Sequence, residues 1–303
     1  MTVLSPEHAP ATPAASAAVK KKRRWHRVAI PFTALLVLIV TTVVLHAVEE
    51  PDKEDPAFLS PVHDASIGAS GLARRLEESG VRVQRETRTS DALLSAYQGN
   101  ATLLIPAPEL MHADYLAMLA SMPNTTRVVL VEPDGGVLRR TGAPIVADGT
   151  RWATAVAAAG AACRVEGLVG AGDAAARRTA YRFTPEAVQE QFCYEGGVLR
   201  ARFEDGEFTV VGSADPFRND RLGEHDNAAF ALGLLGTRPR VVWLDVHTEE
   251  PGPLVDPNAT PGEAVPPSMA PGGGSGDGGG SGDGSGQGNG EGQGEGQGEG
   301  SGS

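Results

Sequence analysis

The sequence predicts an α/β domain that lies between an apolar N-terminal helix and a glycine-rich tail. Within residues 49–248, short apolar runs typical of buried strands alternate with helical patterns, which favours a parallel sheet with helices on both faces. Residues 28–48 contain no charged side chain. Residues 249–303 hold 20 of the 39 glycines and no Lys or Arg. Such a tail cannot bury enough apolar surface to fold, so we expect it to be disordered.

The first half of the domain predicts a regular succession of short elements. The all-apolar runs are typical of strands buried on both faces of a parallel sheet. The expected elements are a helix at 69–79, a strand at 81–85, a helix at 89–97 that Thr89, Ser90 and Asp91 can cap, a strand at 101–105, a helix at 109–121 and a strand at 126–132. The helix at 109–121 is expected to point five side chains inward: Leu110, Met111, Tyr115, Met118 and Leu119.

The second half of the domain is less regular. The alanine-rich stretch at 152–162 predicts a helix that leads to Cys163, followed by a loop. The runs VLRARFE and EFTVVGS flank Asp205-Gly206, which is a strong signal for a β-hairpin. Residues 226–236 are apolar nearly all round and predict a buried helix, and residues 240–244 predict the last strand.

The apolar run at 28–48 predicts an uncleaved membrane anchor. Its 21 residues, at about 1.5 Å each, match the roughly 30 Å of bilayer hydrocarbon. The basic run KKKRRWHR precedes it and the acidic run EEPDKED follows it. The positive-inside rule therefore places residues 1–27 in the cytoplasm and the domain at 49–248 outside the plasma membrane, in a single-pass topology.

Two other interpretations of this region are less favoured. A cleaved signal peptide would end near Leu45-His46-Ala47, but the apolar run is longer than a usual signal core. A nuclear localisation signal would account for KKKRR but not for the apolar run that follows it. The domain itself is acidic within a chain of net charge −12 and has no basic cluster, which argues against nucleic acid as a partner.

The two cysteines of the chain, Cys163 and Cys193, both lie in the predicted outside domain. A disulfide between them would constrain the unfolded chain by roughly 3 kcal/mol. The alternative is a pair of buried thiols. A catalytic role for Cys163 is disfavoured, because neither G-x-C-x-G nor G-x-S-x-G, the signatures of a nucleophile at a strand-to-helix elbow, occurs in the chain.

Other motifs are too weak to predict a cofactor or a metal. Residues 170–175 match G-x-G-x-x-A but follow no clear strand, so we interpret them as a loop. The histidines at 63, 112, 225 and 247 show no metal-ligand spacing. We therefore expect no catalytic residue, metal or cofactor.

The best candidate surface is a polar loop between the strand FTVVGS and the buried helix. In open α/β sheets, ligands bind where parallel strands end, so this loop is placed to contact a ligand or partner. The competing interpretation is structural, with Asp226 as a helix cap and the two asparagines bonded to loop backbone groups. The candidate residues are Asp215, Asn219, Asp220, Asp226 and Asn227.

Three stretches of the sequence resemble one bacterial family. They are PDKEDPAFLSPVHDASIGASGLARRLEESGVRV, TLLIPAPELMHADYLAMLA, and VVGSADPFRNDRLGEHDNAAFALGLLG followed by RVVWL. Together they look like the family called domain of unknown function 4350, over about residues 50–245 and most clearly at 209–244. Cys163 and Cys193 also fall where actinobacterial members tend to have cysteines.

The resemblance implies a fold similar to the flavodoxin-like, class I glutamine amidotransferase-like doubly wound sheets, with a biochemical role that is not established. It also implies proximity to a MoxR-type AAA ATPase and to von Willebrand A-like or transglutaminase-like envelope proteins. Family members usually carry a second membrane helix and a short cytoplasmic tail after the domain. Since the sequence ends within the Gly-rich tract, we expect either truncation before such a helix or a domain tethered at one end.

These observations predict a membrane-anchored, extracytoplasmic accessory protein of the bacterial cell envelope with no catalytic site. Two alternatives use the loop that contains Asp215 and Asn227. One is a module that binds a small ligand or glycan, and the other is a degenerate hydrolase. Turnover of an envelope substrate that is lost in Asp215→Ala would favour the hydrolase.

Overall fold

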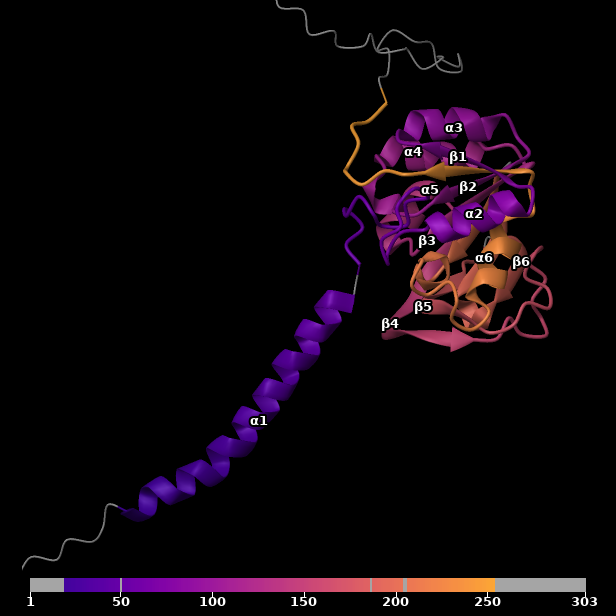
Figure 1. Cartoon of the computed structure of the whole chain (residues 1–303). Coiled ribbons are helices and arrows are strands. Elements are labelled where there is room, and N and C mark those ends of the chain that lie inside the picture. The colour runs from indigo at the N-terminus through magenta and orange to yellow at the C-terminus, as the bar shows by residue number, and fades with distance from the viewer. Residues whose placement is uncertain (1–18, 50, 186, 204–205, 254–303) are drawn as a thin grey trace, which may run out of the picture. The chain divides into compact units, whose positions relative to one another are not determined.

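The computed structural model describes residues 19–49, 51–185, 187–203 and 206–253 (Figure 1). Most of the predicted cytoplasmic segment and nearly all of the predicted tail lie outside these residues. Helix α1 (Val19–Glu49) includes the apolar run that the sequence predicts as a membrane anchor. Among the helices of the described residues, none is both long and apolar enough to span a bilayer.

The domain is built on a seven-stranded sheet in the order β1-β9-β2-β3-β8-β7-β6 (Figure 1). The first five of these strands run parallel, and β7 and β6 extend one edge in antiparallel fashion. The mostly parallel sheet confirms the predicted α/β class. The strands are β1 (Arg82–Glu86), β2 (Ala101–Ile105), β3 (Thr126–Val131), β6 (Val188–Cys193), β7 (Val198–Phe203), β8 (Gly206–Val211) and β9 (Arg240–Leu244).

The connectivity of the sheet differs from the order 2-1-3-4-5 of a flavodoxin-like sheet. Numbered along the chain, the five parallel strands lie in the order 1-5-2-3-4, because β9 inserts between β1 and β2. If β9 is counted as the first strand instead of the last, the same positions become 2-1-3-4-5. The strand positions are therefore related to the predicted fold by moving one strand from the start of the chain to its end.

Helices cover both faces of the sheet (Figure 1). Helix α2 packs against α6, and α4 packs against α5. In the view of Figure 1, α3 and α4 lie on one side of β1 and β2, and α2 lies on the other. The helices are α2 (Ser70–Glu78), α3 (Thr89–Tyr97), α4 (Ala113–Met118), α5 (Gly135–Thr141) and α6 (Asn227–Leu235).

The single helix predicted at 109–121 is wrong. The chain forms a 3-10 turn η1 (Pro108–Leu110), the short helix α4, and a second 3-10 turn η2 (Leu119–Ser121). His112 interrupts the helix, because its extended backbone starts α4 and its ring accepts a hydrogen bond from the Asp114 amide at 3.3 Å. The break rotates Met118 outward, where it is 45% exposed instead of buried.

The helix predicted at 152–162 is also wrong. Its first part belongs to β4 (Ile145–Ala157), which pairs with β5 (Ala174–Phe183) in a separate antiparallel hairpin. Alanine content favours a helix by propensity, but the backbone pairing to β5 decides the structure here. The hairpin crosses the end of β8, where Gly212 accepts hydrogen bonds from the amides of Arg178 and Thr179. A side chain on Gly212 would collide with the Thr179 carbonyl, so the crossing requires glycine.

The core lies between the sheet and its helices. Phe230 of α6 is fully buried and makes edge-to-face contacts with Tyr194 and Phe217, at centroid distances of 5.0 and 6.1 Å. Trp243 of β9 is also fully buried, and its indole nitrogen donates to the Leu59 carbonyl. The predicted buried helix at 226–236 is confirmed as α6, whose five buried side chains face this core.

Candidate functional site

The polar loop predicted as a binding surface is held mainly by the protein's own backbone. The Asn219 side chain donates to the His63 and Ala65 carbonyls at 3.0 and 2.8 Å and accepts from the Gly71 amide at 2.9 Å. Asn227 is fully buried and accepts from the Ala175 amide at 2.9 Å. These two side chains fasten neighbouring loops together, so they are not presented to a ligand.

Two of the three aspartates of the loop share one arginine, and the third lies at the start of α6. Arg218 donates to Asp215 at 3.3 Å and to Asp220 at 2.8 Å. Asp226 stands at the start of α6, but its side chain makes no capping hydrogen bond, so the capping interpretation is wrong. Its backbone is not extended as a cap requires, and its carboxylate lies against Gly172 instead.

A different constellation of acids gathers where the parallel strands end. Glu132 directly follows β3, Asp245 directly follows β9, and Glu250 lies in the segment that continues from β9. We refer to these three residues as the edge acids. In doubly wound sheets this edge is where ligands, often anionic ones, are bound. Here each edge acid is itself bound by donors of the chain.

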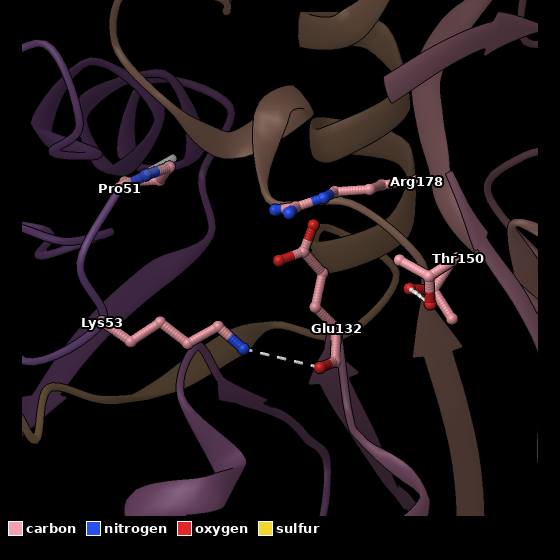
Figure 2. Close-up of a pocket in the computed structure, with 6 residues that line it drawn as sticks. Pro51, Lys53, Glu132, Thr150 and Arg178 are labelled. Carbon is pink, nitrogen blue, oxygen red and sulfur yellow. Dashed lines mark hydrogen bonds between the residues drawn. The ribbon is translucent and has the colours of Figure 1, made fainter. Parts of the chain in front are cut away.

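Glu132 lies beside an open pocket of about 190 Å³, shown in Figure 2. Its Oε1 accepts a hydrogen bond from the Ala214 amide at 3.2 Å, and Figure 2 shows the Arg178 guanidinium facing its carboxylate. The Lys53 ammonium lies 3.5 Å from the Glu132 carbonyl oxygen and is ion-paired with Glu109. The Glu132 carboxylate thus faces one guanidinium and accepts one backbone amide, while the Lys53 ammonium lies at the main-chain oxygen of the same residue. The pocket is lined by Pro51, Lys53, Glu132, Thr150, Arg178 and Thr179.

Glu132 has an unfavourable backbone conformation and a carboxyl group whose pKa is shifted. Its φ of 47° lies in the left-handed region, which side chains other than glycine rarely adopt. Burial raises the pKa of the Glu132 carboxyl, an effect that the charges of Lys53 and Arg178 only partly offset. A strand, a left-handed residue and a following helix also form the shape of a nucleophile elbow, but the elbow here carries a carboxylate.

Asp245 is bound by three side chains and is almost fully buried. Ser60 donates to its Oδ2 at 3.0 Å, Arg85 is ion-paired with the same oxygen, and His247 contacts Oδ1 at 2.9 Å. Ser60 and His247 therefore both contact the carboxylate, and no serine–histidine hydrogen bond of a hydrolytic triad is formed between them.

Glu250 is bound at the start of α3. Its carboxylate accepts the Thr89 amide, with 3.0 Å to the nearer oxygen, and also the Thr89 hydroxyl. The self-capping of this helix by residues 89–91 is therefore wrong, because an acid from the far end of the domain accepts the terminal amide. The segment after β9 is held in place by this contact and by a hydrogen bond from the Glu250 amide to the Leu110 carbonyl.

Cys163 and Cys193 form a disulfide, with their Cα atoms 4.8 Å apart. The bond ties the loop between β4 and β5 to the end of β6 and lies among buried side chains. Within the part of the chain that the structure describes, no three acidic, histidine or cysteine side chains are grouped to hold a metal ion.

The sequence contains one signal for two of the edge acids. Glu132 follows VVLV and Asp245 follows VVWL, so each is the first polar residue after a buried strand. The sequence pattern does not identify the groups that surround Glu132. Lys53, Arg178 and Ala214 come from three distant segments, and only the folded sheet edge brings them to Glu132.

The chain is similar in sequence to a known protein and to a known family. It is 27% identical over 235 residues to an uncharacterized membrane protein of Mycobacterium tuberculosis (strain H37Rv). That match covers 77% of this chain and 58% of the relative, so the chain spans somewhat more than half of the relative's length. No solved structure matches the chain. The model of the family named Domain of unknown function (DUF4350) matches residues 63–235, and the chain belongs to this family.

Proposed function

We propose that the protein is a membrane-anchored, extracytoplasmic accessory protein that binds a partner in the bacterial cell envelope and performs no catalysis. The observation that carries this proposal is the occupied sheet edge. Where an α/β enzyme offers donors to a substrate, this domain bonds them to Glu132, Asp245 and Glu250. A sheet whose edge is filled by its own acids is better suited to a scaffold than to turnover.

The membrane anchor in this proposal is the apolar run at 28–48. The run continues to Val48, beyond Val43, the last residue of α1 whose side chain the structure describes. In α1, the large apolar side chains from Val28 to Val43 are about half exposed or more, as expected of a helix whose surroundings are lipid. The relative's description as a membrane protein supports the anchor. The basic residues before the run and the acidic residues after it support an outside domain.

The disulfide supports the same location. Disulfides persist in oxidising compartments outside the cytoplasm and are rare inside it. An alkaline phosphatase fused after residue 250 is expected to be active, and a reporter that works only in the cytoplasm is expected to be silent there. The reverse pattern would contradict the proposed topology.

The partner class in this proposal is a protein of the envelope, including those associated with MoxR-type ATPases that the family resemblance implies. Binding of a glycan or small ligand through the loop at 215–227 is less favoured, because Asn219 and Asn227 are committed to backbone groups. The degenerate hydrolase is less favoured because Ser60 and His247 are not bonded to each other but both bind Asp245. Kinship with flavodoxin-like and glutamine amidotransferase-like sheets belongs to the proposal as well, supported by the strand positions.

The test is affinity capture of the tagged full chain from solubilised membranes of its source organism after cross-linking. A matched control keeps the domain and replaces residues 28–48 by an unrelated membrane helix. We expect the same envelope proteins with both baits, since the domain is the binding part. Recovery that depends on the native helix would contradict binding through the domain. Turnover of an envelope substrate by the purified chain would contradict the absence of catalysis.

A further inference from the structure

The three edge acids differ in how well the fold accommodates them. Asp245 is almost fully buried, and both of its oxygens have partners. Glu250 has no left-handed backbone, and its carboxylate accepts a hydrogen bond from the first amide of α3. Glu132 alone among the three combines a left-handed backbone with an adjoining open pocket. Glu132 is therefore the edge acid with open space directly beside the groups that bind it.

The groups around Glu132 are of the kinds that bind a carboxylate. The Ala214 amide and the Arg178 guanidinium face the Glu132 carboxylate, and the Lys53 ammonium lies at the Glu132 main-chain oxygen and lines the same pocket of about 190 Å³ (Figure 2). Backbone amides and cations of this kind are the usual partners of carboxylates and phosphates. A group the size of acetate fits in this volume.

We propose that this pocket, the Glu132 pocket, binds a carboxylate group of a small ligand, and that the Glu132 side chain is its built-in occupant and gate. Ligand binding requires Glu132 to give up the donors. It does so when its carboxyl takes up a proton, since the neutral group no longer needs cationic partners and can donate its O–H to the incoming carboxylate. One proton is thus taken up for each carboxylate that is bound. This inference goes beyond the proposed accessory role and does not depend on it.

The charges around Glu132 are compatible with such a gate. Lys53 and Arg178 favour the ionised form, whereas burial and Asp215 favour the neutral form. Glu109, from η1, is ion-paired with Lys53, and Tyr181, from β5, lies close enough for its own pKa to be raised by burial and by the Glu132 charge. Burial is the largest of these effects on Glu132, so its neutral form is reached at a higher pH than for an exposed glutamate.

The test measures acetate binding to the purified full chain, against chloride at matched ionic strength. In the wild type, the affinity for acetate is expected to rise by about tenfold per pH unit as the pH falls from 8 toward the Glu132 pKa, because one proton is bound with each ligand. Glu132→Gln mimics the protonated gate, so it is expected to bind acetate at pH 8 at least about tenfold more tightly than the wild type, with little pH dependence.

Further variants guard against a failed or misleading result. Glu132→Gly removes the side chain and relieves the left-handed backbone, and it too is expected to bind acetate at pH 8. Glu250→Gln removes an acid at the same edge outside the pocket and should keep the wild-type pH profile. Lys53→Met added to Glu132→Gln should weaken acetate binding. Inorganic phosphate is titrated in the same way. The proposal is overturned if Glu132→Gln and Glu132→Gly bind acetate no better than the wild type, or if phosphate binds and acetate does not.

Discussion

Two regions of the domain are stabilised by different means. The region from α2 to β3 uses short strands, of which β2 and β3 are buried along their whole length, with helices packed between them. The region from β4 to β7 uses a long hairpin, most of whose β4 residues are exposed, and it is fastened by a disulfide. Where apolar strands supply the core, no covalent tie is needed. Where they do not, the hydrogen bonds between the β4–β5 hairpin and Gly212 and the disulfide stabilise the region.

Helix α6 joins the two regions, because it packs against α2 of the first and β5 of the second. Phe230→Asp is therefore expected to have the largest effect and to abolish folding. An unpaired buried carboxylate costs several kcal/mol, against a total stability of about 5–15 kcal/mol. The matched control is Ala229→Asp, on the exposed side of the same helix. Circular dichroism of the two purified variants decides, and a cooperatively melting Phe230→Asp protein would show that α6 does not hold the regions together.

A buried ion pair connects β3 of the first region to the neighbouring strand β8, near the start of both strands. Arg127 of β3 donates to Glu207 of β8 at 2.7 Å, and both side chains are at most 2% exposed. Arg127→Met is expected to destabilise the protein by about 3–5 kcal/mol, because Glu207 keeps only part of its compensation. Arg221→Met, which breaks an exposed pair with Glu224, should cost under about 1 kcal/mol. Equal losses in urea titrations of the two variants would rule out a special role for the buried pair.

The disulfide prediction sharpens the contrast between the regions directly. Cys163→Ser is expected to cost about 2–4 kcal/mol, and Cys163→Ser with Cys193→Ser no more than either single change. Loss of the bond should accelerate hydrogen exchange at 160–200 first, while β2 and β3 stay protected. Uniform loss of protection over both regions would mean that they unfold as one unit.

The sequence predicts the first region better than the second for a physical reason. Runs such as 101–105 and 126–132 carry their own burial pattern, so their strands are confirmed with nearly the predicted bounds. The stretch at 152–162 has high helix propensity, and its strand structure is decided by pairing with β5, more than ten residues further along the chain. The candidate site shows the same limit. Glu132 can be placed at a strand end, but its donors are brought together only by tertiary structure.

Acid is expected to weaken the contact that Glu207 of β8 makes with Arg127 of the first region and Arg200 of the second. Burial alone would raise the pKa of this carboxyl, but hydrogen bonds and charges from Arg200 and Arg127 hold it below its ordinary value. The stabilisation is then complete above the unfolded-state pKa of about 4.3 and is lost as the pH falls through the lower folded-state pKa. Thermal melts between pH 7 and pH 3 should show a decline that is smaller in Glu207→Gln. An identical decline in the variant would assign the acid sensitivity to other groups.

The smallest expected change in stability tests whether the first region depends on the segment that follows β9. Helix α3 belongs to that region, yet its first amide and the Thr89 hydroxyl are bound by Glu250 from beyond β9. Glu250→Gln keeps an acceptor oxygen but removes the charge that favours a helix start, so we expect a loss of about 0.5–1 kcal/mol. Glu249→Gln, at the exposed neighbouring position, is the matched control and should change stability by less. Hydrogen exchange should quicken at the first turn of α3 and not at β2 or β3, because the contact supports only the helix end. If exchange at α3 is unchanged in Glu250→Gln, the first region is complete without the segment that follows β9.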